Sequence, residues 1–194
     1  MNARGVSGVN PNDTLATERL VLRRPVPEEA EHLAAIAADP SIPKNLGGMP
    51  HPFTQEMAAG YLRGLQANWG ADGFAFGIYR IDGPPLIGMT GLHGLRNGAP
   101  TIHYWLATAE RGRGYATEVA RAMLGLAFET LRAPHVDADH FLDNPASGRV
   151  LEKCGFAETE RRDVWSRGRG HYAPGRLMRL TREDWERSAR DREA

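Results

Sequence analysis

The segment ERGRGYATEVARAML, residues 110–124, decides the fold. It follows TIHYWLA (residues 101–107), a run rich in β-branched and aromatic residues that is typical of a strand. Apolar residues then recur along one helical face: Ala120, Leu124, Ala127 and Leu131. The tetrapeptide RGRG at residues 111–114 is therefore predicted to be a turn from a strand into a helix.

Such a turn offers a binding site for an anion. The first amides of a helix have no intrahelical acceptor, and they add to the positive end of the helix dipole. Gly112 and Gly114 lack a Cβ, so a phosphate can approach the main chain, while Arg111 and Arg113 bring positive charge to the rim. We expect a pyrophosphate to bind here.

The same tetrapeptide occurs again at residues 167–170, within SRGRGHYAPG. This copy lies between two strand-like runs, and Pro174 and Gly175 come after it, so no helix supplies aligned amides. The second RGRG is predicted to be a flexible hairpin loop.

Length and composition suit one domain. The 194 residues are 41% hydrophobic, and we expect a flexible lead-in over residues 1–17 and a single domain over 18–194. A net charge of +0 gives no overall field for nucleic acid or an anionic membrane. No apolar run has membrane-spanning length, no secretory signal is found, and Cys154 is the single cysteine, so a cytoplasmic location is expected. The seven histidines have no compact ligand spacing, and no metal site is expected.

Strand-like and helix-like segments alternate along the chain. The predicted strands span residues 19–24, 74–81, 84–95, 101–107, 135–141, 156–165 and 175–181. The predicted helices span residues 27–40, 54–70, 115–131 and 145–154, with a frayed helix from residue 182 on. Residues 41–53 are predicted to form a long irregular loop. This order indicates an α/β (α+β) fold, with a mixed, mostly antiparallel seven-stranded sheet flanked by helices.

Two motifs resemble those of a known family. RGRGYA, residues 111–116, is similar to the Q/R-x-x-G-x-G/A loop of the GNAT N-acetyltransferases, with Ala116 at the final small position. NPASGRVLEKCGF, residues 144–156, resembles the downstream motif of the branch that contains the RimJ/RimL ribosomal-protein N-terminal acetyltransferases. With ERLVLRR and HYWLA, the resemblance covers about residues 17–181.

The resemblance implies a GNAT fold in which strands 101–107 and 135–141 splay apart around acetyl-CoA. It places the pantetheine arm on main-chain groups around Trp105, Leu106 and Ala107. It places the pyrophosphate on Arg111, Gly112, Arg113, Gly114, Tyr115 and Ala116. Asn144 would point toward the cofactor arm, and it is also a good N-cap for a helix that begins at Pro145.

Acetyl transfer to an amine needs a neutral amine, and the departing thiolate needs a proton donor. Many family members use a tyrosine as that donor, but the matching position here is Leu151. Ser147 matches a serine of the RimJ/RimL-like branch and is the candidate donor, although a serine at a helix start also bonds to its own backbone. Asp139 and His103 are the candidate bases, together with His140, and each also suits a packing role in a strand.

The identity of the acceptor stays open at this stage. It is a primary amine, either a protein N terminus or a small molecule, and its choice would depend on residues 41–53, the helix after them and the second RGRG. A rival hypothesis comes from residues 160–176, where five arginines and interleaved aromatic side chains are typical of an RNA-binding surface. A ribosome-associated or regulatory CoA-binding module is thus the alternative, and a homodimer is also compatible with the sequence.

Overall fold

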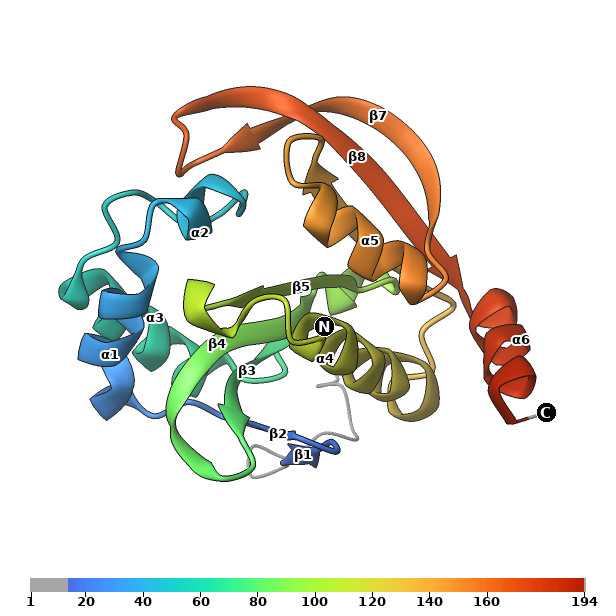
Figure 1. Ribbon diagram of the computed structural model, residues 1–194, viewed down its shortest axis with the longest axis horizontal. Helices are drawn as coiled ribbons and strands as arrows, with labels where there is room; N and C mark the ends of the chain where they lie inside the picture. The colour runs from blue at the N-terminus through green and yellow to red at the C-terminus, as the bar shows by residue number, and fades with distance from the viewer. Residues whose placement is uncertain (1–13, 194) are drawn as a thin grey trace, which may run out of the picture.

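An eight-stranded sheet forms the centre of the protein, whose computed structural model describes residues 14–193 (Figure 1). The strands are β1 Leu15–Ala16, β2 Leu20–Arg23, β3 Gly73–Arg80, β4 Gly83–His93, β5 Thr101–Leu106, β6 His135–Phe141, β7 Ala157–Ser166 and β8 His171–Thr181. Their spatial order is β1-β2-β3-β4-β5-β6-β8-β7, and only the β5–β6 pair is parallel. The mixed, mostly antiparallel sheet is confirmed, with one strand more than expected.

The additional strand is β1, which lies within the expected lead-in. Leu15 pairs with Leu22 of β2, and the Thr17 hydroxyl accepts a hydrogen bond of 3.0 Å from the Leu20 amide. The two-residue strand was missed because its ordering contacts come from β2 and not from its own sequence. The rest of the expected lead-in, residues 1–13, lies outside the described residues.

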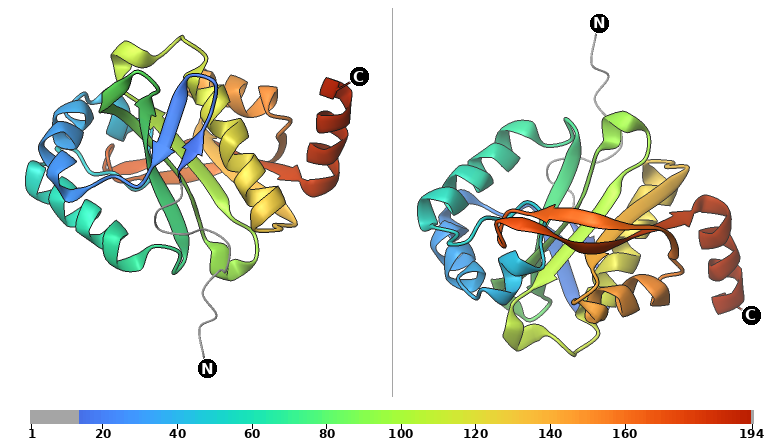
Figure 2. Two further views of the ribbon diagram at one scale, coloured as in Figure 1. Left: turned by 90° about the horizontal axis from the view of Figure 1, so that it is seen from below. Right: turned by 90° about the horizontal axis from the view of Figure 1, so that it is seen from above.

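Helices cover both faces of the sheet (Figure 2). They are α1 Ala30–Ala37, α2 Ser41–Lys44, α3 Gln55–Asn68, α4 Tyr115–Gly125, α5 Pro145–Lys153 and α6 Arg182–Glu193. On one face, Leu33 of α1 and Leu62 of α3 pack with Met89 in one buried cluster. On the other, Met123 of α4 and Leu151 of α5 belong to the larger cluster. A π-helical turn, Leu126–Thr130, extends α4 to the end that the sequence pattern predicts.

The sheet opens between β5 and β6. These strands pair only at Thr101 and Asp137, where the Asp137 amide donates to the Pro100 carbonyl over 2.9 Å. Beyond that pair the two strands diverge, as the resemblance implies. The main-chain groups on the open side of β5 are therefore available to a ligand.

The β7–β8 hairpin arches over this opening and reaches α2 (Figure 1). Residues 41–53 were expected to be irregular throughout, but Ser41–Lys44 form the short helix α2. The Ser41 amide donates to the Asp39 carboxylate over 2.9 Å, which caps this turn locally. The hairpin and the segment after α2 together form a roof above the gap.

Candidate active site

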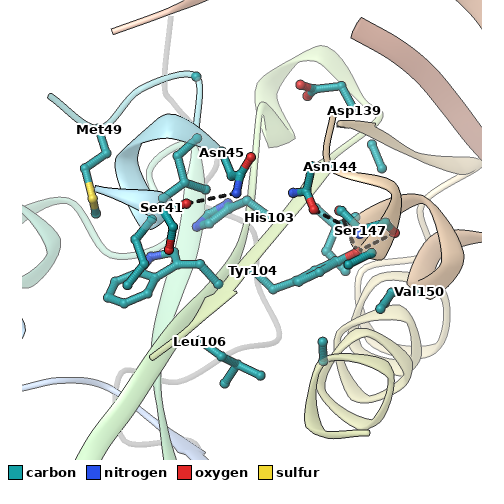
Figure 3. A pocket seen from close by; sticks show the side chains of 18 of the residues that line it. Ser41, Asn45, Met49, His103, Tyr104, Leu106, Asp139, Asn144, Ser147 and Val150 are labelled. Carbon is teal, nitrogen blue, oxygen red and sulfur yellow. Dashed lines mark hydrogen bonds between the residues drawn. The ribbon is translucent and has the colours of Figure 1, made fainter. Parts of the chain in front are cut away.

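One cleft of about 1020 Å³ occupies the gap between β5 and β6 (Figure 3). Most of the residues predicted from the sequence line it: His103, Trp105, Leu106, Arg111, Gly112, Gly114, Tyr115, Ala116, Asp139, Asn144 and Ser147. Ala107 and Arg113 do not line it. These residues come from four parts of the chain, and they meet in one cavity of the size that ligand sites have.

The first RGRG forms the beginning of α4, as predicted. Gly112 and Gly114 have φ angles of 79° and 82°, a conformation that favours glycine. No other heavy atom lies within 4 Å of the position that a Gly112 Cβ would take. The amides of Thr117 and Glu118 donate to the Gly114 carbonyl, so the amides before them have no intrahelical acceptor. This geometry fits a pyrophosphate on the main chain.

Arg19 holds this loop from the side. Its Nη1 donates to the Arg113 carbonyl over 2.9 Å, and its Nη2 lies 2.6 Å from Glu118 Oε2. Burial raises the pKa of Glu118, but hydrogen bonds from Thr17 and Arg19 outweigh it and leave the pKa lowered. The Arg113 side chain lies outside the cleft, 3.7 Å from Glu110. Of the two arginines of this loop, Arg111 lines the cleft and Arg113 does not.

Along the open edge of β5, the main-chain groups of every second residue face the gap. The Ala107 amide donates to the Ile87 carbonyl of β4 over 2.8 Å. Because hydrogen bonding alternates along an antiparallel strand, the main-chain groups of Tyr104 and Leu106 face the gap instead. Of the three residues that the resemblance implies for the pantetheine arm, Leu106 therefore has main-chain groups that face the gap, whereas the Ala107 amide is bonded to β4.

A pair of hydroxyls lies where α5 approaches β5. The Tyr104 hydroxyl is 3.2 Å from Ser147 Oγ, and the Asn144 side chain accepts from the Ser147 amide over 3.4 Å (Figure 3). Burial raises the pKa of Tyr104, so this phenol stays protonated at neutral pH. Leu151 is buried in the core and carries no polar group. A tyrosine hydroxyl therefore enters this region from β5 rather than from α5.

Two imidazoles and a carboxylate lie on the opposite side of β5 from Tyr104. The Nδ1 atoms of His93 and His103 are 3.4 Å apart, so one ring donates and the other accepts. Burial, and to a lesser extent His93, lowers the pKa of His103 to about 4. Desolvation by the cleft walls raises the pKa of the Asp139 carboxyl. Gly91 makes room for this pair, because a Cβ there would lie 2.7 Å from the His103 ring.

His93 and Tyr104 are the site residues that sequence reasoning missed. The alternation of β5 could have identified Tyr104, because it faces the same side of the strand as Leu106. His140, by contrast, does not line the main cleft. It is buried with Nδ1 2.9 Å from the Phe141 carbonyl and its ring against Gly148, so its role is in packing.

The second RGRG is a hairpin turn, as expected, but it is packed rather than free. The Arg167 amide donates to the Gly47 carbonyl over 2.9 Å, and a Cβ on Gly168 would lie 2.3 Å from the Pro43 carbonyl oxygen. Arg169 binds both carboxylate oxygens of Asp143, at 2.7 and 3.0 Å. These contacts with α2 and the β6–α5 turn explain why the expected flexible loop is an ordered part of the roof.

A comparison with known families agrees with this geometry. Residues 19–157 match the model of the acetyltransferase (GNAT) domain. The chain belongs to the GNAT acetyltransferase family. The N-acetyltransferase YoaA of Bacillus subtilis, whose own activity is uncharacterized, is 30% identical over 145 residues, which cover 73% of this chain and 81% of YoaA. This GNAT protein is therefore an acetyl-CoA-dependent N-acetyltransferase.

Solved structures confirm the fold. Mycobacterium smegmatis RimJ, in complex with CoA-disulfide, superposes with a TM-score of 0.77 at 21% identity, covering 89% of this chain and 88% of RimJ. RimL, a ribosomal alpha-N-protein acetyltransferase in complex with coenzyme A, gives 0.72 at 16% identity, covering 87% of this chain and 98% of RimL. Within residues 14–193, no helix is both long and apolar enough to cross a bilayer, and no metal-ligating cluster of three side chains is found.

Proposed function

We propose that this acetyltransferase acts by direct attack of a neutral primary amine, with its proton donor and its proton acceptor on opposite sides of β5. The arrangement of β5 supports this most strongly: Tyr104 lies beside Ser147 on the α4 side, and His103 lies beside His93 on the α3 side. The bound acetyl-CoA supplies the thioester. The open main-chain groups of Tyr104 and Leu106 and the first turn of α4 hold it between these pairs.

The donor side serves the departing thiolate. The Ser147 hydroxyl donates to the sulfur as the C–S bond breaks, and the Tyr104 phenol donates to Ser147 Oγ. Asn144 fixes the start of α5 by accepting from the Ser147 amide, so the hydroxyl keeps its position. Many family members use a tyrosine at the position where this chain has Leu151. In this arrangement Tyr104 and Ser147 together take the role of that tyrosine.

The acceptor side receives the proton of the amine. His103 is neutral at physiological pH, so its ring accepts a hydrogen bond from the amine without repelling it. Asp139 accepts the proton, because its raised pKa makes its carboxylate a better base than an ordinary aspartate. The same surface fits a protein N terminus and a small amine, both of which the sequence left open.

The RNA-binding alternative has less support. Three of the five arginines in residues 160–176 are in ion pairs: Arg161 and Arg176 with Glu158, and Arg169 with Asp143. These guanidinium groups are already neutralised, which leaves little free charge for phosphates. The hairpin is therefore proposed to shape the acceptor side of the cleft.

Single-turnover acetylation of an amine by the Ser147→Ala and Tyr104→Phe variants tests the proposal. Each is expected to lower kcat by roughly 10²-fold while acetyl-CoA binding stays close to wild type. In Asp139→Asn, kcat at saturating amine is expected to lose the part of its fall on acidification that protonation of Asp139 causes, whereas the fall in kcat/KM that protonation of the free amine causes remains. An unchanged kcat in Ser147→Ala would refute the donor role.

A further inference from the structure

The acceptor side of the cleft has an apolar wall. The wall consists of Met49, Phe53, Met57, Tyr61 and Trp105. Met57 and Tyr61 lie one helical turn apart on α3, and they are among the large apolar side chains that stay exposed, at 43% and 39%. Ala58 and Leu62 of the same helix are buried, so α3 packs on the core through a different face from the one that carries Met57 and Tyr61. Large apolar side chains exposed together in a cleft mark a binding surface.

The wall lies on the face of the sheet that the acceptor must use. His103 and Trp105 alternate with Tyr104 along β5, so they share the α3 face. Trp105 packs against the cluster formed by α1 and α3. The wall therefore lines the acceptor chamber and not the cofactor loop.

The acceptor side of the cleft offers one carboxylate that is in no ion pair of the described residues, and Arg149, Lys153 and Arg167 also line the cleft. Only two acids line the cleft among the described residues, Glu110 and Asp139. Glu110 is paired with Arg80 at 3.0 Å, whereas Asp139 has no ion pair within residues 14–193. Figure 3 shows Met49 and Asp139 on opposite sides of the view, projecting from different elements. One carboxylate matches one ammonium group.

Polycationic amines fit this chamber poorly. A polyamine or an aminoglycoside carries several positive charges, and each would need its own anion after losing its water. Arg167, at the hairpin end of the cleft, forms no ion pair within the described part of the chain and would repel a second positive charge. Conversely, an apolar body would cover the exposed Met57 and Tyr61, and the flexible thioethers of Met49 and Met57 adapt to its shape.

We infer that the acceptor is a monoamine whose primary amino group is attached to an aromatic or branched aliphatic body. The inference rests on the proposed function, because it assigns the acceptor of that same site. The ammonium group approaches Asp139 and His103, and the body lies on the apolar wall. The N-terminal residue of a peptide and a free small amine both have this chemistry.

Acceptor competition with the full-length protein tests the inference. Phenylalaninamide, glycinamide and spermidine are offered with saturating acetyl-CoA, and product is measured by mass. The expected kcat/KM for phenylalaninamide is at least about tenfold above that for glycinamide, the range that apolar pockets achieve. Equal rates with glycinamide, or a preference for spermidine, would overturn the inference and leave the proposed function intact.

Two variants test whether the apolar wall causes the preference for phenylalaninamide over glycinamide. Met57→Gln combined with Tyr61→Ser is expected to bring the phenylalaninamide to glycinamide ratio close to one. Ile81→Gln, a change at a 60% exposed apolar side chain that does not line the cleft, is the matched control and should keep the wild-type ratio. If the double variant kept the wild-type ratio of phenylalaninamide to glycinamide, the wall would not be the surface that binds the acceptor.

Equilibrium binding separates the two proposals. If no amine is acetylated, the proposed function fails, but calorimetry of phenylalaninamide and glycinamide with CoA-saturated protein still tests the chamber. Tighter binding of phenylalaninamide supports the inference, and equal binding refutes it. A phenylalanine-led pentapeptide in place of phenylalaninamide then distinguishes a peptide N terminus from a free amine.

Discussion

The two RGRG segments have one sequence and opposite surroundings. In residues 111–114 both glycines have positive φ, the Cβ position of Gly112 is in open space and that of Gly114 meets only the end of the Arg19 side chain, at 3.4 Å. A helix begins directly after them, so the main chain is accessible to a ligand. In residues 167–170 Gly168 contacts Pro43 and Arg169 is bound to Asp143, so the main chain is covered by protein. Identical residues thus form an open turn, the proposed cofactor site, in one place and part of the roof in the other. The next element along the chain, a helix or a strand, decides between them.

The largest expected difference between the copies concerns cofactor binding. Gly114→Trp should weaken acetyl-CoA binding roughly 100-fold, or about 2.8 kcal/mol, because the indole would occupy the proposed phosphate site. Gly170 has the equivalent position in the second copy, with a φ of 70° and open space around its Cβ position. Gly170→Trp should leave binding unchanged. Isothermal titration of both variants measures this, and equal losses would contradict the difference between the two segments.

A smaller effect is expected on the stability of the roof. Gly168→Ala would place its Cβ 2.3 Å from the Pro43 oxygen, so the hairpin must move away from α2. We expect a loss of about 1–3 kcal/mol in the free energy of unfolding, measured with urea. Gly60→Ala, on α3 with nothing within 4 Å, is the control and should not destabilise the protein. A neutral Gly168→Ala would mean that the hairpin tip is not held by α2.

The ion pair between Arg169 of the second RGRG and Asp143 makes the free energy of unfolding depend on pH. Hydrogen bonds from Arg169 lower the pKa of Asp143 to about 2, from an ordinary value of 3.8. The pair therefore stabilises the protein above about pH 4, and this contribution is lost as the pH falls toward 2. Because Asp143 is half exposed, we expect only about 0.5–1 kcal/mol.

The free energy of unfolding, measured between pH 5 and 2, should fall less steeply in Asp143→Asn than in the wild type. Asp163→Asn is the control, because Asp163 is exposed on β7 and forms no ion pair within residues 14–193. Parallel curves for wild type and Asp143→Asn would show that the pair contributes nothing.

The smallest effect concerns the arginine side chains. Arg111→Gln is expected to weaken acetyl-CoA binding about threefold, and less at high salt, because an exposed charge contributes little and is screened. Arg167→Gln, the equivalent change in the second copy, should leave that affinity unchanged. Titrations at two salt concentrations distinguish them, and a larger effect from Arg167 would mean that the cofactor extends under the hairpin.

Much of the fold was predictable, because it depends on short contiguous patterns. The turn before α4 and the N-cap at Asn144 follow from local residues, whereas the splayed strands were implied by the resemblance to the GNAT family. The pairing of His93 with His103 was not predictable, because it depends on strand register and on the space above Gly91. The alternation of β5 could have placed Tyr104 on the side of Leu106, but its contact with Ser147, 43 residues further along the chain, was not predictable.

The contacts of the roof also indicate the order in which parts of the protein form during synthesis. Arg169 donates to the Lys44 carbonyl across 125 residues, and Ser166 donates to the Leu46 carbonyl across 120. Contacts of such high sequence separation form late, since a long loop must close first. The turn before α4 is formed by neighbouring residues, and the Arg19 side chain that holds it comes from a segment that precedes it in the chain. During synthesis the turn before α4 is therefore complete in sequence while the cleft still lacks its cover, and the roof forms only when the last hairpin emerges.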